Sequence, residues 1–130
     1  MPVKINIIED GIGIEFILTG RITGNEIIEA NNKIYTKECL RRLKYKLIDR
    51  SDCTDYNITP EELKFIANQD IHASQINSNI TVIIISKTEL QYGMSRMWQV
   101  FSGETGFKSE LFKDRESADI FINKSFLKPN

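Results

Sequence analysis

The sequence predicts an α/β fold, with a mixed five-stranded sheet that opens with an antiparallel hairpin and continues as βα repeats with four helices. Three observations favour this class. Alternating apolar residues flank Asp10 and Gly11 near the start of the chain. Later segments alternate between short β-branched runs and amphipathic stretches, and motifs typical of helix starts separate them. The length of 130 residues suits a single domain, 1–130.

The first two predicted strands flank the turn at Asp10 and Gly11. Apolar and polar residues alternate on both sides of it, which is the pattern of a strand with one buried face. The alternating apolar residues are Val3, Ile5, Ile7, Ile12, Ile14, Phe16 and Leu18. Asp-Gly between two such runs is typical of a tight hairpin, so we expect antiparallel pairing.

Three capping boxes predict where three helices begin. In each, a hydroxyl residue precedes a Glu by three positions, so that both side chains bond free backbone N–H groups of the first turn. The boxes lie at Thr23–Glu26, Thr59–Glu62 and Ser86–Glu89. They predict helices over about 24–40, from Pro60 onward and over about 88–102. Asp114 is the expected cap of the fourth helix.

The remaining strands alternate with these helices. A short strand is expected at 45–48, ending at Asp49, and we interpret the polar segment 49–58 after it as a loop. The run 80–85 is almost entirely apolar and β-branched, which is typical of a strand buried on both faces of a parallel sheet. A last short strand is expected at 111–112. Right-handed crossovers between these strands yield a mostly parallel sheet.

Composition restricts the classes of partner and the cellular location that we expect for this protein. The net charge of −1 provides no global attraction for nucleic acid, so no nucleic-acid partner is expected. The longest apolar run, 82–85, is far too short for a transmembrane segment. The first residues lack the basic and apolar regions of a signal peptide, so the expected location is cytoplasmic.

No catalytic or metal-binding constellation is evident in the sequence. The single histidine, His72, falls within a predicted helix, and Cys39 and Cys53 lack the close spacing of zinc ligands. A Ser or Cys nucleophile needs a base that a third group holds in place. We therefore expect no metal, no cofactor and no enzymatic activity.

One polar segment is a candidate binding surface. Ligands of open α/β sheets meet the loops at the carboxyl ends of strands, which here are the segments 49–58 and 86–88. The candidate partner- or ligand-binding residues of the first loop are Asp49, Arg50, Ser51 and Tyr56. Turn formation and helix capping also explain Asp and Ser at such positions, so both interpretations stay open.

A second candidate cluster lies on the helix predicted over 88–102. Tyr92 and Arg96 are four residues apart and therefore share a face. Gly93 between them costs about 1 kcal/mol relative to Ala in a helix interior, but it permits close approach of a ligand or another backbone. Tight packing of the helix on the sheet, with the Arg96 stem covering apolar surface, is the alternative.

The order of the elements and the segment Leu90–Gln99, with its Tyr-Gly-x-x-Arg-Met core, resemble the SpoIIAA-like branch of the STAS domains. Some classifications group this branch with CRAL-TRIO-type lipid-binding domains. The resemblance covers nearly the whole chain. It implies a SpoIIAA-like sheet with four helices and a branch without an assigned function.

STAS domains of the anti-sigma-factor antagonist type carry an Asp-Ser-Ser-Gly stretch at the start of the second helix, where a kinase phosphorylates one serine. The matching stretch here is Asn57–Pro60, in which only Thr59 keeps a hydroxyl and Pro60 replaces a small residue. The resemblance thus implies Thr59 as a phosphorylation site, where a phosphate would gain from the helix N-terminus. Capping of the helix also explains Thr59.

Two functional hypotheses follow. The first is a non-enzymatic, regulatory module that docks a protein partner through the segment 49–59 and neighbouring helices. The second is a small-molecule or lipid-binding domain with a pocket near Tyr92, Gly93 and Arg96, where Arg96 would hold an anionic head group by charge-assisted hydrogen bonds.

A homodimer is a further expectation. Trp98 and the region of Phe101, or the open edge of the leading hairpin, provide surfaces that can pair across a two-fold axis. Burial of Trp98 in the core is the alternative.

Overall fold

The computed structural model describes residues 3–103 and 107–127, which form a five-stranded sheet with helices on both faces. The strands are β1 (Val3–Ile8), β2 (Gly13–Thr23), β3 (Tyr45–Asn57), β4 (Thr81–Ile85) and β5 (Lys108–Phe112). They lie side by side in chain order. β1 and β2 pair antiparallel, whereas all later neighbours pair parallel. The predicted α/β class, mixed sheet and leading hairpin are confirmed.

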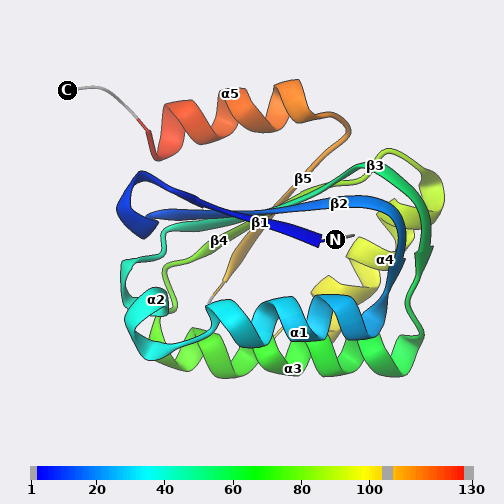
Figure 1. Cartoon of the computed structure of the whole chain (residues 1–130), viewed down its shortest axis with the longest axis horizontal. Coiled ribbons are helices and arrows are strands. Elements are labelled where there is room, and N and C mark those ends of the chain that lie inside the picture. The colour runs from blue at the N-terminus through cyan, green and yellow to red at the C-terminus, as the bar shows by residue number, and fades with distance from the viewer. Residues whose placement is uncertain (1–2, 104–106, 128–130) are drawn as a thin grey trace.

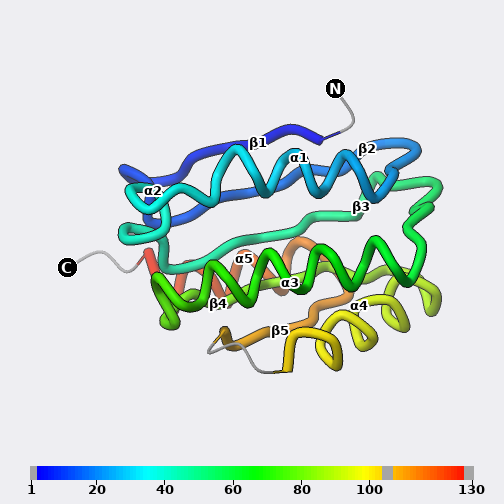
Figure 2. Tube along the Cα trace, turned by 90° about the horizontal axis from the view of Figure 1, so that it is seen from below, coloured from blue at the N-terminus to red at the C-terminus, as the bar shows by residue number. Residues whose placement is uncertain are grey.

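The helices divide unequally between the two faces of the sheet. They are α1 (Gly24–Ile34), α2 (Lys37–Arg42), α3 (Pro60–Ile76), α4 (Glu89–Phe101) and α5 (Arg115–Ser125). Among the described elements, α1, α3 and α4 lie against one face and α5 is the helix that covers the other (Figure 1). Figure 2 shows α1, α3 and α4 following one another across the same face. The face under α1, α3 and α4 therefore has the larger interior.

The hairpin turn depends on backbone conformations that most residues avoid. Glu9, Asp10 and Gly11 have φ values of 48°, 60° and 92° and form the short 3-10 turn η1 (Glu9–Gly11). Left-handed φ values are strained for residues with a Cβ and free for glycine. The turn brings Ile8 opposite Gly13 and sets the register of β1 on β2.

The prediction of one helix over 24–40 is wrong, because this segment forms two helices. Tyr35 leaves the helical region at φ −88° and ψ 58°. Thr36 then begins α2, and its hydroxyl accepts a hydrogen bond from the Cys39 backbone N–H at 3.2 Å. The described residues therefore form five α-helices rather than the predicted four.

The predicted loop over 49–58 is also wrong, since β3 continues through it to Asn57. β4 accompanies β3 only as far as the pair Asp49 and Ile85. β2 continues beside β3 up to the pair Thr23 and Asn57, with two irregular steps in register. The polar residues can form a strand here because β2 pairs with their backbone on one side.

The predicted caps are correct for three of four helices. The Thr23 and Thr59 boxes are both formed, and Asp114 accepts from the Ser117 backbone N–H at 2.8 Å. The α4 cap, however, is Thr88, which accepts from the Gln91 N–H at 3.1 Å. Ser86 is buried instead and belongs to the candidate site described below.

Two apolar cores lie on the two faces of the sheet. β4 contributes Val82 and Ile84 to the core under α1, α3 and α4, and Ile83 and Ile85 to the smaller core under α5. This confirms the prediction that the run 80–85 is buried on both faces. Among the described residues, no helix is long and apolar enough to cross a membrane.

Candidate functional site

A cavity of about 50 Å³ lies between the sheet and the three helices α1, α3 and α4. One water-sized probe occupies roughly 10–15 Å³, so the cavity has room for a few atoms. Its wall consists of Ile27, Lys46, Ile48, Arg50, Tyr56, Leu63, Ile66, Asp70, Val82, Ile84, Met94, Ser95 and Trp98. Most of this lining is apolar, and three charged side chains interrupt it.

The period of a β-strand explains why two cations enter this cavity. Lys46, Ile48 and Arg50 are alternate residues of β3, so their side chains point to the same face of the sheet. All three line the cavity. Asp49, between Ile48 and Arg50, points to the opposite face, where it contacts Arg115 of α5.

Arg50 is the most unusual residue of the wall, because its guanidinium is buried with only 2% of the residue exposed. Its Nε donates to the Ile85 carbonyl at 3.2 Å. Its Nη2 donates to Ser86 Oγ at 2.5 Å and to the Gln91 carbonyl at 3.3 Å. Nη2 also donates to Ser95 Oγ of α4, so Arg50 joins β4 to α4.

The charge of Arg50 has no anionic counterpart in the described part of the chain. Its hydrogen-bond acceptors are carbonyls and hydroxyls, and the Tyr56 ring lies 4.8 Å from its Cζ. The ion pairs among the described residues do not include it. Burial lowers the pKa of Arg50, against a smaller opposing effect of Tyr56, but a guanidinium remains charged in proteins. Arg50 is therefore a buried cation that its own structure solvates but does not neutralise.

Lys46 differs from Arg50, because a carboxylate balances its charge. Lys46 Nζ lies 3.8 Å from Asp70 Oδ1, and the two side chains are 4% and 3% exposed. Nζ also donates to Asn31 Oδ1 at 2.6 Å and to the Tyr35 hydroxyl at 2.8 Å. Burial lowers the pKa of Lys46, and Asp70 opposes this effect.

Asp70 accepts two further hydrogen bonds that hold the helices together. The Tyr35 hydroxyl donates to Oδ1 at 2.5 Å, and Trp98 Nε1 donates to Oδ2 at 2.7 Å. Burial, and then the charge of Asp70, raise the pKa of Tyr35 well above its ordinary value. These bonds connect the end of α1, α3 and α4 around one buried carboxylate. Trp98 is therefore a core residue, only 7% exposed, rather than a dimer surface.

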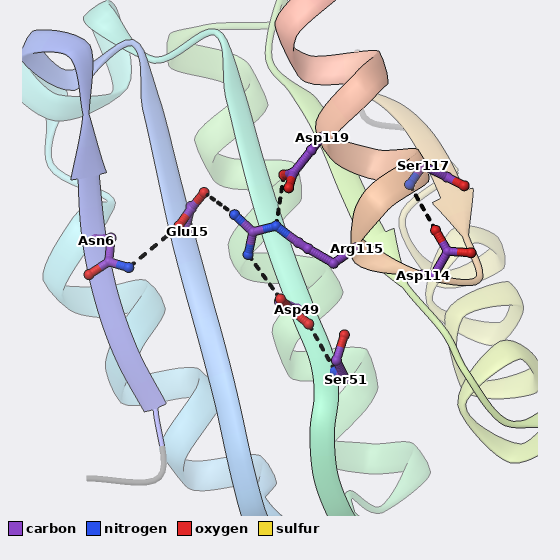
Figure 3. A network of polar contacts seen from close by, with 8 residues as sticks. All are labelled: Asn6, Glu15, Asp49, Ser51, Asp114, Arg115, Ser117 and Asp119. Carbon is purple, nitrogen blue, oxygen red and sulfur yellow. Dashed lines mark hydrogen bonds and ion pairs between the residues drawn. The ribbon is translucent and has the colours of Figure 1, made fainter.

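A separate polar network lies on the α5 face of the sheet (Figure 3). Arg115, the first residue of α5, bonds Glu15 at 2.7 Å, Asp49 at 2.9 Å and Asp119 at 2.7 Å. Asp49 also accepts from the Ser51 backbone N–H at 2.9 Å. Burial alone would raise the pKa of Asp49, but the bonds from Ser51 and Arg115 hold it below its ordinary value. This network attaches α5 to β2 and β3.

Comparison with known proteins identifies the fold. No family model and no curated protein matches the chain. A solved structure is similar to the chain: an uncharacterised protein of the DUF3478 family with a SpoIIAA-like fold, from Shewanella loihica PV-4. The TM-score is 0.52 with 19% sequence identity, and the match covers 92% of this chain and 90% of the other. The fold is SpoIIAA-like. The structural neighbour has no assigned function, so it identifies the scaffold alone.

In this SpoIIAA-like domain, the candidate residues predicted in the segment 49–59 separate into distinct groups. Arg50 and Tyr56 line the cavity, whereas Asp49 and Ser51 belong to the network on the α5 face. Thr59 is exposed at the start of α3, and its hydroxyl accepts from the Glu62 N–H at 3.1 Å. Its phosphorylation remains a prediction.

The residues near which a pocket is predicted, Tyr92, Gly93 and Arg96, do not line this cavity, and a pocket beside them stays a prediction. All three residues are on the exposed side of α4 and none lines the cavity. A Cβ added at Gly93 would have no heavy atom within 4 Å, so tight packing against the described part of the chain does not explain this glycine. The cavity lies behind α4, on the side formed by Met94, Ser95 and Trp98.

Sequence reasoning missed the buried network around Lys46 and Asp70. Each left a weak signal: Lys46 is a charge inside an apolar strand, and Asp70 interrupts the apolar stripe of α3. Neither signal indicates the other residue as its partner. Only the packing of α3 against β3 shows that the two charges meet.

Proposed function

We propose that this SpoIIAA-like domain is a non-enzymatic binding protein that takes up a small anionic molecule in the cavity behind α4, with Arg50 as its anchor. The observation that supports this function is that Arg50 is buried beside a cavity and that none of the described ion pairs gives Arg50 a carboxylate partner. Buried charges in proteins are usually paired, because leaving an ion unpaired in apolar surroundings is costly. An anion in the cavity would supply the missing partner.

The proposal is for binding without catalysis. Ser86 and Ser95 each place a hydroxyl next to Arg50. The histidine of the chain, His72, is exposed on α3 and is not part of the cavity wall. A serine nucleophile without a positioned base remains a weak nucleophile.

The direct test is to titrate purified protein with a panel of small anions by calorimetry. We expect at least one anion to bind saturably to the wild type and to lose that binding in Arg50→Gln. Arg96→Gln is the matched control, since it removes an exposed arginine of α4 that does not line the cavity. Equal binding to Arg50→Gln and to the wild type would refute the proposal.

A protein partner is the second candidate, and the outer side of α4 supports it. Leu90, Met97 and Val100 are apolar and 68%, 39% and 78% exposed. They surround Gly93 on the same side of the helix. Exposed apolar groups that gather on one surface are typical of interaction sites.

This second candidate has its own test. Val100→Glu would place a charge on the outer side of α4 without contact with the cavity wall. We expect it to abolish capture of a partner from a cell extract while anion binding is kept. Capture that is equal for Val100→Glu and the wild type would exclude this surface.

A further inference from the structure

The charges in the cavity wall set the charge of the molecule that fits there. Arg50, Lys46 and Asp70 are its cationic and anionic members. Lys46 and Asp70 balance each other at 3.8 Å, so the formal charge that remains is the one of Arg50. A single negative charge neutralises it. A dianion would leave a net negative charge among apolar groups, where an uncompensated ion is strongly disfavoured.

Size and polarity restrict the ligand further. The cavity has about 50 Å³, compared with roughly 10–15 Å³ for one water-sized probe. Beyond the charged groups, its wall is largely made of aliphatic side chains, namely Ile27, Leu63, Ile66, Val82 and Ile84. Such a wall favours a short hydrocarbon body. A long acyl chain exceeds this space.

The polar end of the cavity matches a carboxylate. The Arg50 guanidinium and the Ser95 hydroxyl belong to the wall at this end. Nε and Nη2 of Arg50 donate to acceptors of the protein, so one carboxylate oxygen would bond to Nη1, and the Ser95 hydroxyl can rotate to donate to the other oxygen. The Ser95 hydroxyl now donates to the Gln91 carbonyl of the same helix at 3.0 Å, so the rotation needs no backbone change.

We infer that the ligand of this cavity is a short-chain aliphatic monocarboxylate, with its carboxylate on Arg50 and its hydrocarbon body among the aliphatic residues of α1, α3 and β4. This inference rests on the proposed function and specifies its ligand class. It excludes dianions by charge and fatty acids of membrane-lipid length by size.

The test compares ligands that differ in one property. Butyrate is the probe, butyramide has the same shape without the charge, and succinate has the same carbon count with two charges. Inorganic phosphate and palmitate complete the series. By calorimetry and thermal shift with wild-type protein, we expect butyrate to bind at least about tenfold more tightly than each of the other four. Arg50→Gln should lose butyrate binding, and Arg96→Gln should keep it.

The outcomes separate this inference from the proposed function. Binding of succinate or phosphate that is as tight as that of butyrate, and that Arg50→Gln abolishes, would overturn the monocarboxylate and leave the anion site intact. Tighter binding of palmitate than of butyrate would overturn the short chain. Binding of none of the anions would overturn both.

Substitutions of Asp70 and Lys46 test whether the formal charge of the cavity wall determines which ligand binds. Asp70→Asn raises the formal charge of the wall by one, so succinate and phosphate should gain affinity relative to butyrate. Lys46→Met lowers it by one and should weaken butyrate at least about tenfold although Arg50 is intact. An unchanged order of affinities in both folded variants would refute the role of charge. If either variant fails to fold, the ligand series with the wild type decides the question.

Discussion

Lys46 and Asp70 are charged residues that meet inside an apolar core. Their side chains are 4% and 3% exposed, and Asn31, Tyr35 and Trp98 occupy their remaining hydrogen-bonding groups. Such a pair contributes little net stability, because desolvation offsets the attraction. Removing one partner, however, leaves the other as a buried and uncompensated charge. The pair is therefore sensitive to single substitutions in a way that surface pairs are not.

We predict that Asp70→Ala lowers the free energy of unfolding by about 3–5 kcal/mol, because Lys46 is left buried and unpaired. The double variant Lys46→Met with Asp70→Ala should recover part of this loss, since the unpaired buried cation is then absent. Urea denaturation measures both. The exposed pair Arg21 and Asp55, 72% and 53% exposed, is the control: Arg21→Ala should change the free energy by less than about 1 kcal/mol. A loss in Asp70→Ala no greater than in Arg21→Ala would contradict this prediction.

Asp49 leads to a prediction about pH. Its pKa is lower in the folded protein than its ordinary value, because Ser51 and Arg115 bond the carboxylate. A carboxylate whose pKa is lower in the folded than in the unfolded protein stabilises the folded state. This contribution is complete above the unfolded pKa of about 3.9, and it is lost as the pH falls through the folded pKa. Asp49→Asn should therefore show a shallower loss of stability with acid than the wild type.

The measurement is the urea midpoint of unfolding at a series of pH values from about 7 to 2. Asp52→Asn is the matched control, because Asp52 is exposed on the same strand. Equal acid sensitivity of Asp49→Asn and the wild type would show that the bonds of Asp49 to Ser51 and Arg115, drawn in Figure 3, do not contribute to the pH dependence of stability.

Helix α4 has a buried face and an exposed face, and a glycine, Gly93, lies on the exposed one. Gln91, Ser95 and Trp98 are buried against the sheet and α3, whereas Leu90, Gly93 and Val100 are exposed. The helix is attached to β3 through the bond from Arg50 to Ser95 and to α3 through the bond from Trp98 to Asp70. Ligand and partner would thus act on opposite faces of one helix.

Gly93→Ala should raise the free energy of unfolding by about 0.5–1 kcal/mol, since alanine favours the helix and meets no neighbour. Gly13→Ala is the contrasting variant, because its Cβ would lie 2.2 Å from the Tyr45 ring. It should destabilise the fold. Thermal unfolding of both variants checks the pair, and a loss of stability in Gly93→Ala would mean that something packs against this position.

The long strand β3 shows how an element can have two functions. It carries Lys46 and Arg50 to the cavity and Asp49 to Arg115 on the other face. Beyond Asp49 it loses β4 as a neighbour but keeps β2. Its end therefore brings Tyr56 over Arg50, with the ring 4.8 Å from the guanidinium carbon.

In the whole molecule, the proposed binding cavity and the Arg115 network lie on opposite faces of the sheet. The cavity lies under α1, α3 and α4, and the Arg115 network with its apolar core lies under α5 (Figures 1 and 3). A ligand in the cavity should therefore affect one side of the sheet. The homodimer stays a prediction. Trp98, one of the surfaces suggested for it, is buried within the chain.

We expect butyrate to slow amide hydrogen exchange in α4 and in residues 50–56, because a bound ligand stabilises the segments that enclose it. Amides of α5 should be unchanged, which makes the opposite face an internal control. Mass spectrometry of peptide fragments measures this. Uniform slowing over both faces, or slowing confined to α5, would contradict the location of the site.

Features that depend on residues close together in the chain could be predicted from the amino-acid sequence. The alternation around Asp10 and Gly11 specifies the hairpin, and the boxes at Thr23 and Thr59 specify where α1 and α3 begin. The apolar run 80–85 specifies β4. Each of these signals acts over a few residues, so it can be recognised without knowledge of the fold.

Features that depend on residues far apart in the chain follow from tertiary packing and could not be predicted in this way. The polar residues 49–57 form a strand because β2 pairs with their backbone, and this extension of β3 places Arg50 on the same face as Lys46 and Ile48. Packing determines whether a buried charge has a partner. Lys46 lies next to the Asp70 carboxylate, whereas Arg50 lies in the wall of a cavity. Sequence reasoning therefore selected Arg50 as a candidate residue, and the fold decided that it lies in the interior behind α4 rather than on a surface loop.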